Sequence, residues 1–429
     1  MNIYQDWGFR ETPFSTMSLA PNEMGESLLI GRDTEISSLT RKLFTPPKIP
    51  TIEGLNGVGK TSLVNVVAYK AYKSYMKDGI GKLYIPCNKI FQLNPQIDIQ
   101  TFIDHVLMEV AQTLIDKAHE LKENGLSIQT LSIDKWLNSP QLTTYQAGIQ
   151  SAVFGLQGGA SSETNTSSGF ERSGFRKLIM NWLNDIFPDN ENGGVVCVID
   201  NMELLQSSEK AREILEQLRD ELLTLNGLRW VLCGALGIIL GVASSPRLDG
   251  YLHRPVEVGE ISEVFAGQIL SSRINAFKLL SDPYLPLIEK DFIFLYEVLH
   301  GNLRSLISYS DDYCQWIADN QLPNSNDEKH TAFETWFAIT CEAAYQAFKP
   351  QITPRLIEVF KYAQNIGGIF SPSDFQEFGF NSIPAFRPHI KTMEEAGVLV
   401  STQDEGDKRR KTIQITPKGW LVADYLKNQ

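Results

Sequence analysis

Short apolar runs alternate with longer stretches of helical periodicity along the first part of the chain. Apolar residues recur at helical spacing from 98 to 121 and again from 170 to 187, which are lengths typical of helices. The short apolar runs lie at 49–53, 82–87, 195–200, 228–233 and 255–258. Because strands and helices in alternation form parallel sheets, the pattern predicts an α/β domain with a doubly wound, five-stranded parallel sheet.

The pattern also divides the chain into five segments. Helical periodicity without strands predicts a small helical lid, and a polar stretch at 322–329 predicts a linker. Small and polar residues at about 139–173 predict an inserted hairpin or flexible loop, with a disordered linker as the alternative. The expected segments are an N-terminal segment at 1–48, an α/β core at 49–260, the lid at 261–320, a linker with a connecting helix at 321–350, and a last module at 351–429.

Composition limits the partners and the compartment. The net charge is −12, so any grip on nucleic acid must come from a local basic patch. The five cysteines are scattered and never form C-x-x-C, so they predict neither a disulfide framework nor a zinc site and fit a reducing cytoplasm. The N-terminus lacks the pattern of a signal peptide. The longest apolar run, 231–243, is shorter than the roughly 20 residues that a membrane helix needs, and is interpreted as a buried strand plus a loop. We expect a cytoplasmic protein with no membrane partner.

A glycine-rich stretch after the first predicted strand carries the clearest chemistry. Residues 54–62 fit the pattern G-x-x-x-x-G-K-[ST] between a strand and a helix. Backbone N–H groups of such a loop surround a β-phosphate, and the helix directs its positive end at the same anion. Lys60 is expected to reach the β- and γ-phosphates, and Thr61 to ligate Mg²⁺. The stretch predicts ATP binding by Gly54, Asn56, Gly57, Val58, Gly59, Lys60, Thr61 and Ser62, whereas the alternative is an ordinary glycine-rich turn.

Two acids follow the third predicted strand. Asp200 closes that apolar run, at the strand end where ligands bind in open α/β sheets. It is the natural partner for a Mg²⁺ ion held by Thr61. Glu203 is a candidate to orient or activate the attacking water. The alternative is that Glu203 is a helix N-terminal acid favoured by the helix dipole.

The phosphate loop, the Asp200 strand, Arg247 and the stretch 301–304 together resemble the AAA+ ATPase superfamily. The resemblance covers residues 25–320 and implies a P-loop NTPase core with a helical lid. The part from Arg247 to Arg273 is similar to the origin-recognition initiator branch and to the signal-transduction ATPases called STAND. Those branches imply a nucleotide-dependent homo-oligomer.

The same resemblance implies roles for residues outside the phosphate loop. Gly31 and Arg32 lie in a stretch that resembles the N-terminal box lining the adenine pocket, and Arg304 falls where the family carries its second sensor arginine. Arg247 lies where a finger arginine would act on a neighbouring subunit, with Arg254 as the weaker candidate. The alternative for Arg247 is that it caps the preceding turn.

Two positions depart from the family's pattern. The acid that usually follows the strand-end aspartate is Asn201 here, and the first-sensor region 234–236 has no polar side chain. A site without a positioned base and a polar water contact should hydrolyse ATP slowly. We therefore expect a switch rather than a motor.

Residues 351–429 resemble a winged helix like those of multiple-antibiotic-resistance-type repressors. Two alternating strands flank a turn with Gly406, and the hairpin tip is basic. The segment 382–395 is expected to be the recognition helix, although it contains Pro388. The candidate DNA contacts are Arg387 and Lys391 on that helix and Lys408, Arg409, Arg410 and Lys411 on the wing. The alternative is a solvated wing on a protein-interaction domain.

Three functions fit these patterns. The leading one is an ATP-switched, DNA-associated AAA+ assembly protein that uses Mg²⁺ and binds double-stranded DNA through its winged helix, such as a replication, transposition or mobile-element initiator. The second is a STAND-like sensor, for example in antiviral defence, whose winged helix contacts a protein partner or acts as a spacer. The third is a catalytically inactive nucleotide-binding scaffold.

Overall fold

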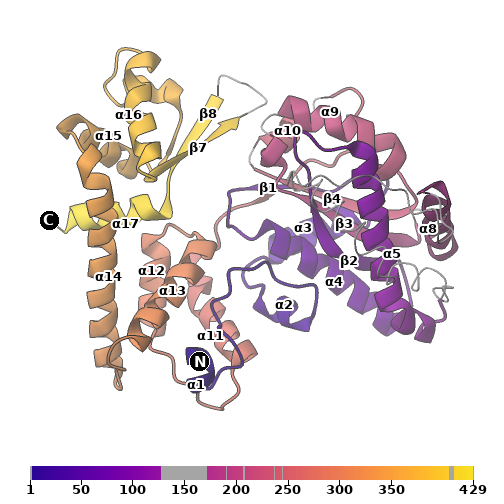
Figure 1. Ribbon diagram of the computed structural model, residues 1–429, viewed down its shortest axis with the longest axis horizontal. Helices are drawn as coiled ribbons and strands as arrows, with labels where there is room; N and C mark the ends of the chain where they lie inside the picture. The colour runs from indigo at the N-terminus through magenta and orange to yellow at the C-terminus, as the bar shows by residue number, and fades with distance from the viewer. Residues whose placement is uncertain are drawn as a thin grey trace.

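A five-stranded parallel sheet forms the centre of the α/β core in the computed structural model (Figure 1). The structure describes residues 2–126, 172–189, 191–205, 208–235, 237–243, 245–404 and 410–428. The predicted insertion at about 139–173 lies outside these ranges except for its last two residues. The strands are β1 (Thr51–Gly54), β2 (Leu83–Gln92), β3 (Gly193–Asp200), β4 (Gly227–Gly234) and β5 (Val256–Val258), in the order β2-β3-β4-β1-β5. The predicted doubly wound, five-stranded parallel sheet is confirmed.

Helices cover both faces of this sheet. One face packs against α3 (Asp33–Leu43) and α4 (Lys60–Asp78), and the other against α5 (Ile99–Glu123), α8 (Arg172–Ile186), α9 (Ser208–Leu218) and α10 (Ile238–Ala243). In β3, Val196 and Val198 point into the first core, whereas Val195, Cys197 and Ile199 point into the second. The strand is apolar throughout because both of its faces are buried.

Three predicted element boundaries are corrected by the structure. The run 231–243 is not a strand plus a loop, because β4 is followed by the helix α10. The predicted linker 322–329 is already helical from Asn326, since Ser325 and Glu328 form a capping box that starts α14 (Asn326–Phe348). The strand predicted at 82–87 continues to Gln92 beyond an irregularity in its pairing with β3.

The segment predicted to be a lid, which keeps that name below, contains α11 (Ala266–Phe277), α12 (Glu289–Val298) and α13 (Leu303–Ala318), and the N-terminal segment packs on it. The short helix α1 (Ile3–Asp6) places the Tyr4 hydroxyl 2.6 Å from Asp311 Oδ1, to which it donates a hydrogen bond. The buried guanidinium of Arg273 donates to the Pro13 carbonyl at 2.7 Å. The N-terminal segment therefore packs as one unit with the lid, although the α/β core lies between the two in sequence.

The last module, which the sequence predicts to be a winged helix, contains helices and a three-stranded antiparallel sheet, and we refer to it below as the winged helix. Its antiparallel sheet has the order β6-β8-β7, and its other elements are three α-helices and a 3₁₀ turn at Pro372–Gln376. The elements are α15 (Pro354–Asn365), β6 (Ile369–Phe370), α16 (Ile383–Glu395), β7 (Leu399–Asp404), β8 (Arg410–Ile415) and α17 (Pro417–Lys427). The predicted recognition helix is α16, which tolerates Pro388 in its interior. Apolar side chains of this module, α14, the lid and the N-terminal segment form one continuous core.

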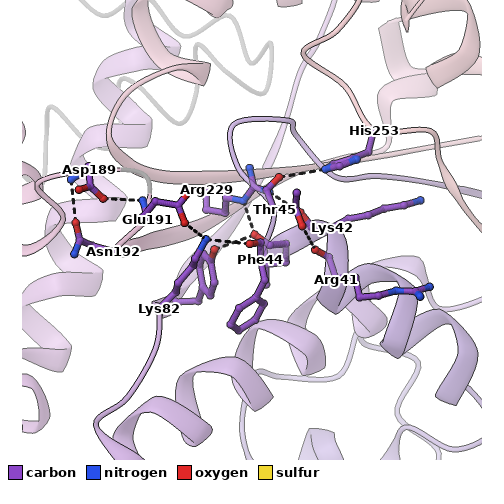
Figure 2. Close-up of polar contacts among 12 residues, drawn as sticks. Arg41, Lys42, Phe44, Thr45, Lys82, Asp189, Glu191, Asn192, Arg229 and His253 are labelled. Carbon is purple, nitrogen blue, oxygen red and sulfur yellow. Dashed lines mark hydrogen bonds and ion pairs between the residues drawn. The ribbon is translucent and has the colours of Figure 1, made fainter.

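Cationic side chains fix the C-terminal end of α3. Arg229 in β4 is buried and donates to the carbonyls of Leu43 at 2.9 Å and Lys42 at 2.6 Å. Figure 2 shows that Lys82, just before β2, and His253, in the segment before β5, reach the next carbonyls of the same turn. The last carbonyls of a helix have no partner within it and carry partial negative charge, so these donors satisfy them and stabilise the helix.

Candidate nucleotide site

The phosphate loop joins β1 to α4 with the backbone shape that its glycines allow. Gly57 and Gly59 have φ angles of 88° and 94°, in the left-handed region that side chains disfavour. Helix α4 begins at Lys60, so the first N–H groups of its opening turn face the loop without helical partners. These groups and the positive end of α4 provide the anion site that the motif predicts.

Lys60 lies inside this loop. Its side chain is buried, and Nζ donates hydrogen bonds to the carbonyls of Gly54 at 2.9 Å and Leu55 at 3.1 Å. The ammonium group is therefore held over the loop by backbone oxygens. A phosphate in the loop would supply a stronger, charged acceptor for the same group.

Thr61 and Asp200 meet at the strand ends. The Thr61 hydroxyl donates to Asp200 Oδ2, and the other carboxylate oxygen accepts the Asn201 N–H at 2.8 Å. Asp200 is only 8% exposed. A hydroxyl and a carboxylate side by side are donors that suit Mg²⁺, so the residues fit this ion. When bound, Mg²⁺ would neutralise charge on the phosphates.

The lid reaches the opposite side of the loop. A Cβ atom built on Gly57 would lie 3.1 Å from Cβ of Arg304 and 3.2 Å from Oδ1 of Asn302. Asn302 also caps α13 by accepting the Ser305 N–H at 3.0 Å. Arg304 thus lies beside the phosphate loop, as a γ-phosphate sensor must. Sequence reasoning gave Asn302 no role of its own, although the stretch 301–304 was part of the resemblance.

The predicted adenine-side box is tied to the loop through Arg32. Its buried guanidinium donates to the carbonyls of Val58 at 2.9 Å and Gly259 at 2.7 Å, and pairs with Glu35 at 2.7 Å. Gly31, at φ 71°, packs its backbone against side chains at the start of the lid. Arg32 therefore holds the N-terminal segment, the phosphate loop and the end of β5 together.

Ser62 has a second partner that the motif does not predict. Its hydroxyl accepts the Leu19 N–H at 3.0 Å, and Asn65 Nδ2 donates to the Leu19 carbonyl at 2.8 Å. The side chain of Ser62 is thus occupied by the N-terminal segment. Its backbone N–H remains in the first turn of α4, where it is available for a phosphate.

Asp200 is followed by a tight turn that carries Glu203. Asn201 has a φ of 54°, and Glu203 lies in the 3₁₀ turn Met202–Leu205. The Glu203 carboxylate accepts the Ala235 N–H at 3.1 Å, which ties it to the end of β4. Its role as a water-orienting acid stays a prediction, as does the absence of a polar sensor side chain, because residue 236 lies outside the described ranges.

Buried groups beside this turn were not predicted. Glu53 in β1 is 3% exposed and accepts the Ile239 N–H at 2.7 Å. Burial, with a smaller effect of the Asp200 charge, raises the pKa of the Cys233 thiol well above its usual value. The thiol is therefore protonated and unreactive at neutral pH. Both residues lie near the carboxyl ends of their strands, β1 and β4.

The two candidate finger arginines lie in different surroundings. Arg247 is 56% exposed, with Nη2 3.6 Å from the Asp220 carboxylate, and its carbonyl accepts a hydrogen bond from Arg219 at 2.9 Å. Arg254 is exposed. Its carbonyl accepts a hydrogen bond from the Lys42 ammonium group at 2.6 Å, beside the end of α3. Neither guanidinium contacts its own phosphate loop. Action on a neighbouring subunit stays a prediction for both.

The winged helix exposes part of its predicted cationic surface. Arg387 is exposed on α16, and Lys391 is 76% exposed, 3.5 Å from Glu395. Lys408 and Arg409 lie outside the described residues, and Arg410 and Lys411 open β8. Within the described ranges, no helix is long and apolar enough to cross a membrane. No cluster of three or more His, Cys, Asp or Glu side chains in those ranges could hold a metal ion by itself.

Comparison with known proteins gives structural likenesses only. No family model and no curated protein matches the sequence. Similar solved structures include Aeropyrum pernix ORC1 in complex with DNA, at 11% identity and a TM-score of 0.41 over 94% of this chain and 97% of that one. Aeropyrum pernix ORC2, in ADPNP–ADP complexes, has 12% identity and a TM-score of 0.46 over 98% of each chain. Cdc6p from Pyrobaculum aerophilum has 14% identity and a TM-score of 0.40 over 97% of this chain and 96% of that one. Values this low leave the function to be argued from this chain's own residues.

Proposed function

We propose that this chain is an ATP-binding switch of the AAA+ type, in which the nucleotide state controls self-association and contact with DNA. One observation carries the proposal: two separate parts of the chain, the end of β3 and the start of α13, converge on the phosphate loop. Thr61 meets Asp200 across the sheet, and Arg304 lies beside Gly57 from the lid. A glycine-rich turn with a purely structural role would not need an acid on one side and an arginine on the other.

Slow hydrolysis follows from the same site. Asn201 stands in place of a second acid, and the Glu203 carboxylate already accepts the Ala235 N–H. A water placed by neither residue would react slowly until another subunit completed the site. Slow turnover in an assembly would distinguish a switch from an inactive scaffold, which would show no turnover in any assembly.

The first prediction concerns Lys60→Ala. We expect ATP–Mg²⁺ affinity to fall by about 10- to 100-fold or more, since a charge-assisted hydrogen bond to phosphate is lost. Titration with a fluorescent ATP analogue measures the affinity. Lys70→Ala is a matched control, because Lys70 lies on the same helix and its side chain is 45% exposed. Unchanged affinity in a folded Lys60→Ala protein would remove the basis of the proposal.

The second prediction concerns DNA. The module 351–429 carries 10 Lys/Arg and 9 Asp/Glu, so a local cluster rather than net charge must meet the phosphates. With Arg409→Ala and Arg410→Ala together, the slope of log affinity against log salt should become less negative by about 2. Loss of Arg387 and Lys391 should instead blunt sequence preference. Duplex binding with ATP across a salt series measures both effects, with Lys361→Ala, at an exposed position of α15, as a control.

A second candidate function is favoured by one observation. The winged helix shares a continuous apolar core with α14 and the lid, as expected of a module that mainly transmits contacts between proteins. A wing variant that binds DNA as tightly, and with the same salt slope, as the wild type would therefore support a STAND-like sensor. Formation of oligomers only in the presence of a protein trigger would support the STAND-like function directly.

A further inference from the structure

The loop between α12 and α13 touches the nucleotide site and the winged helix within a few residues. It contains two consecutive residues with positive φ angles, His300 at 47° and Gly301 at 68°. Left-handed histidine is uncommon and persists where its surroundings hold it. The backbone is therefore fixed in one shape between its two contacts.

The inner end of this loop lies against the phosphate loop and its neighbours. Asn302 approaches Gly57, and a Cβ on Gly301 would lie 2.8 Å from Cβ of Glu260, in the segment that leads from β5 to the lid. The Asn302 carboxamide also starts α13 through its bond to Ser305. A ligand that draws Arg304 toward a γ-phosphate would therefore move Asn302 and this loop with it.

The outer end of the loop lies against the winged helix. The His300 ring stacks on the indole of Trp420 in α17, with centroids 3.4 Å apart and planes 14° from parallel. Trp420 is buried, whereas His300 is partly open to solvent. A Cβ on Gly368, in the turn before β6, would lie 2.4 Å from the same indole. Trp420 thus joins the lid loop to the turn that opens the wing sheet.

We propose that His300 is a positioning residue that couples the nucleotide state of the phosphate loop to the winged helix through its stack on Trp420. The inference rests on the proposed function, since it requires a nucleotide at the loop. A ligand shifts a conformational equilibrium only through contacts that differ between its states. Arg304 and Asn302 supply those contacts, and the left-handed loop passes their displacement to α17.

Other contacts keep the two modules together when the stack is lost. The lid and the winged helix share their apolar core, to which α12 and α17 both contribute. Removal of the His300 ring should therefore leave the fold intact while it weakens the transmission of movement. This separates coupling from stability and makes the idea testable in the whole chain.

The experiment compares three substitutions at His300. His300→Asn and His300→Gly accept the left-handed backbone but remove the ring, whereas His300→Phe keeps an aromatic ring for Trp420. Hydrogen exchange is followed with and without Mg²⁺ and a non-hydrolysable ATP analogue. The reporters are amides of the turn before β6, where Gly368 N–H is bonded to the Ala363 carbonyl at 2.8 Å, and amides of α17.

In the wild type we expect the nucleotide to change exchange at these reporters by about fivefold or more, the lower end of ordinary coupling between sites. His300→Asn and His300→Gly should reduce that change below about twofold, and His300→Phe should restore it. His389→Asn is the matched control, because His389 lies in the winged helix against Phe380, away from the lid.

The outcomes distinguish this inference from the proposed function. Absence of nucleotide binding in the wild type contradicts the proposed function itself. Normal binding with no change at the reporters contradicts the coupling. An equal change in the wild type, His300→Asn and His300→Gly contradicts the role of His300, even if the coupling exists by another route.

Discussion

At the scale of single residues, the buried lysine and arginine side chains donate hydrogen bonds mainly to backbone carbonyl oxygens rather than to carboxylates. Lys60 donates to carbonyls of its own loop, Arg32 to Val58 and Gly259, and Arg229 to the end of α3. Burial lowers the pKa of Arg229 to about 10, which still leaves it charged at neutral pH. Such donors join segments that are distant in sequence and satisfy carbonyls that would otherwise be unpaired.

His253 gives a pH-dependent prediction at this scale. Its ring lies 3.3 Å from the Thr45 carbonyl, and burial, with smaller effects of Arg229, Lys42 and Lys48, lowers its pKa below the usual value. The unfolded chain therefore binds the proton more readily, so the free energy of unfolding should fall as the pH drops below about 6.5. His253→Gln keeps a hydrogen-bond donor and does not titrate.

Urea unfolding of the wild type and His253→Gln between about pH 8 and pH 5 measures the effect. We expect the wild type to lose stability relative to the variant toward acid pH. A constant difference over the whole range would contradict the assignment. His119→Gln, at a position whose side chain is 85% exposed, is the control.

Sequence alone could predict those candidate site residues whose chemistry is encoded locally. Lys60 and Thr61 follow from a motif of adjacent residues, and Asp200 from an acid at the end of an apolar strand. The roles of Asn302 and Glu53 were not predicted, because they depend on contacts with residues that are distant in sequence. Asn302 approaches Gly57, and Glu53 accepts a hydrogen bond from Ile239. Nothing in the spacing of either residue distinguishes it from an ordinary helix cap or a polar strand position.

At the scale of elements, α3 is held at both ends. Arg32, which precedes the first turn of α3, donates a hydrogen bond to the Val58 carbonyl in the phosphate loop. The cationic side chains in Figure 2 bind the last carbonyls of α3. Because the helix is fixed at both ends, it holds the N-terminal box against the lid. A change at the junction should therefore affect stability and nucleotide affinity together.

Gly31→Ala tests this arrangement. The φ of Gly31 is 71°, and a Cβ there would lie 2.8 Å from Ile261 Cγ2 and from Phe265 Cδ2. We expect the free energy of unfolding to fall by about 2–4 kcal/mol, from backbone strain and overpacking combined. Gly79→Ala is the control, because Gly79 has a φ of 64° but open space around it, and should cost only about 1–2 kcal/mol. Equal losses in urea unfolding would mean that the packing against the lid is not tight.

Element types were easier to predict than element ends. The strand β3 is apolar up to Asp200, and β4 is apolar except for Arg229, as a sheet buried on both faces requires. The predicted start of α14 was wrong and α10 was not predicted, because capping and tertiary packing determine these two features. The capping box of Ser325 and Glu328 was visible in the sequence, but its polar surroundings favoured a linker.

At the scale of the whole molecule, the residues that the structure describes form three apolar cores arranged in two bodies. Two cores flank the sheet, and the third joins the N-terminal segment, the lid, α14 and the winged helix. Figure 1 shows the sheet domain on one side and the lid with the winged helix on the other. The phosphate loop lies where they meet, so a nucleotide bound there as proposed would contact both.

A prediction for the assembled protein concerns Arg247. If it acts on the nucleotide of a neighbouring subunit, Arg247→Ala and Lys60→Ala proteins should each be inactive alone. Their mixture should recover part of the turnover, because an Arg247→Ala subunit with an intact phosphate loop can receive the arginine of a Lys60→Ala neighbour. Phosphate release measures turnover, and light scattering confirms that the two variants assemble. No recovery in mixed assemblies would contradict action between subunits, and Arg254→Ala tests the other candidate.

The docking of the first residues on the lid has a consequence for synthesis. Tyr4 and its partner Asp311 are 307 positions apart. At the usual rates of elongation, about 15–60 s pass between the appearance of one and the other. During that time the aromatic side chains of Tyr4, Trp7, Phe9 and Phe14 have no core to enter, although all four end up buried in it. The sheet domain can complete its own two cores meanwhile. The opening segment is thus among the last parts of the protein to reach its place, and we expect it to be a recognition site for chaperones on the ribosome-bound chain.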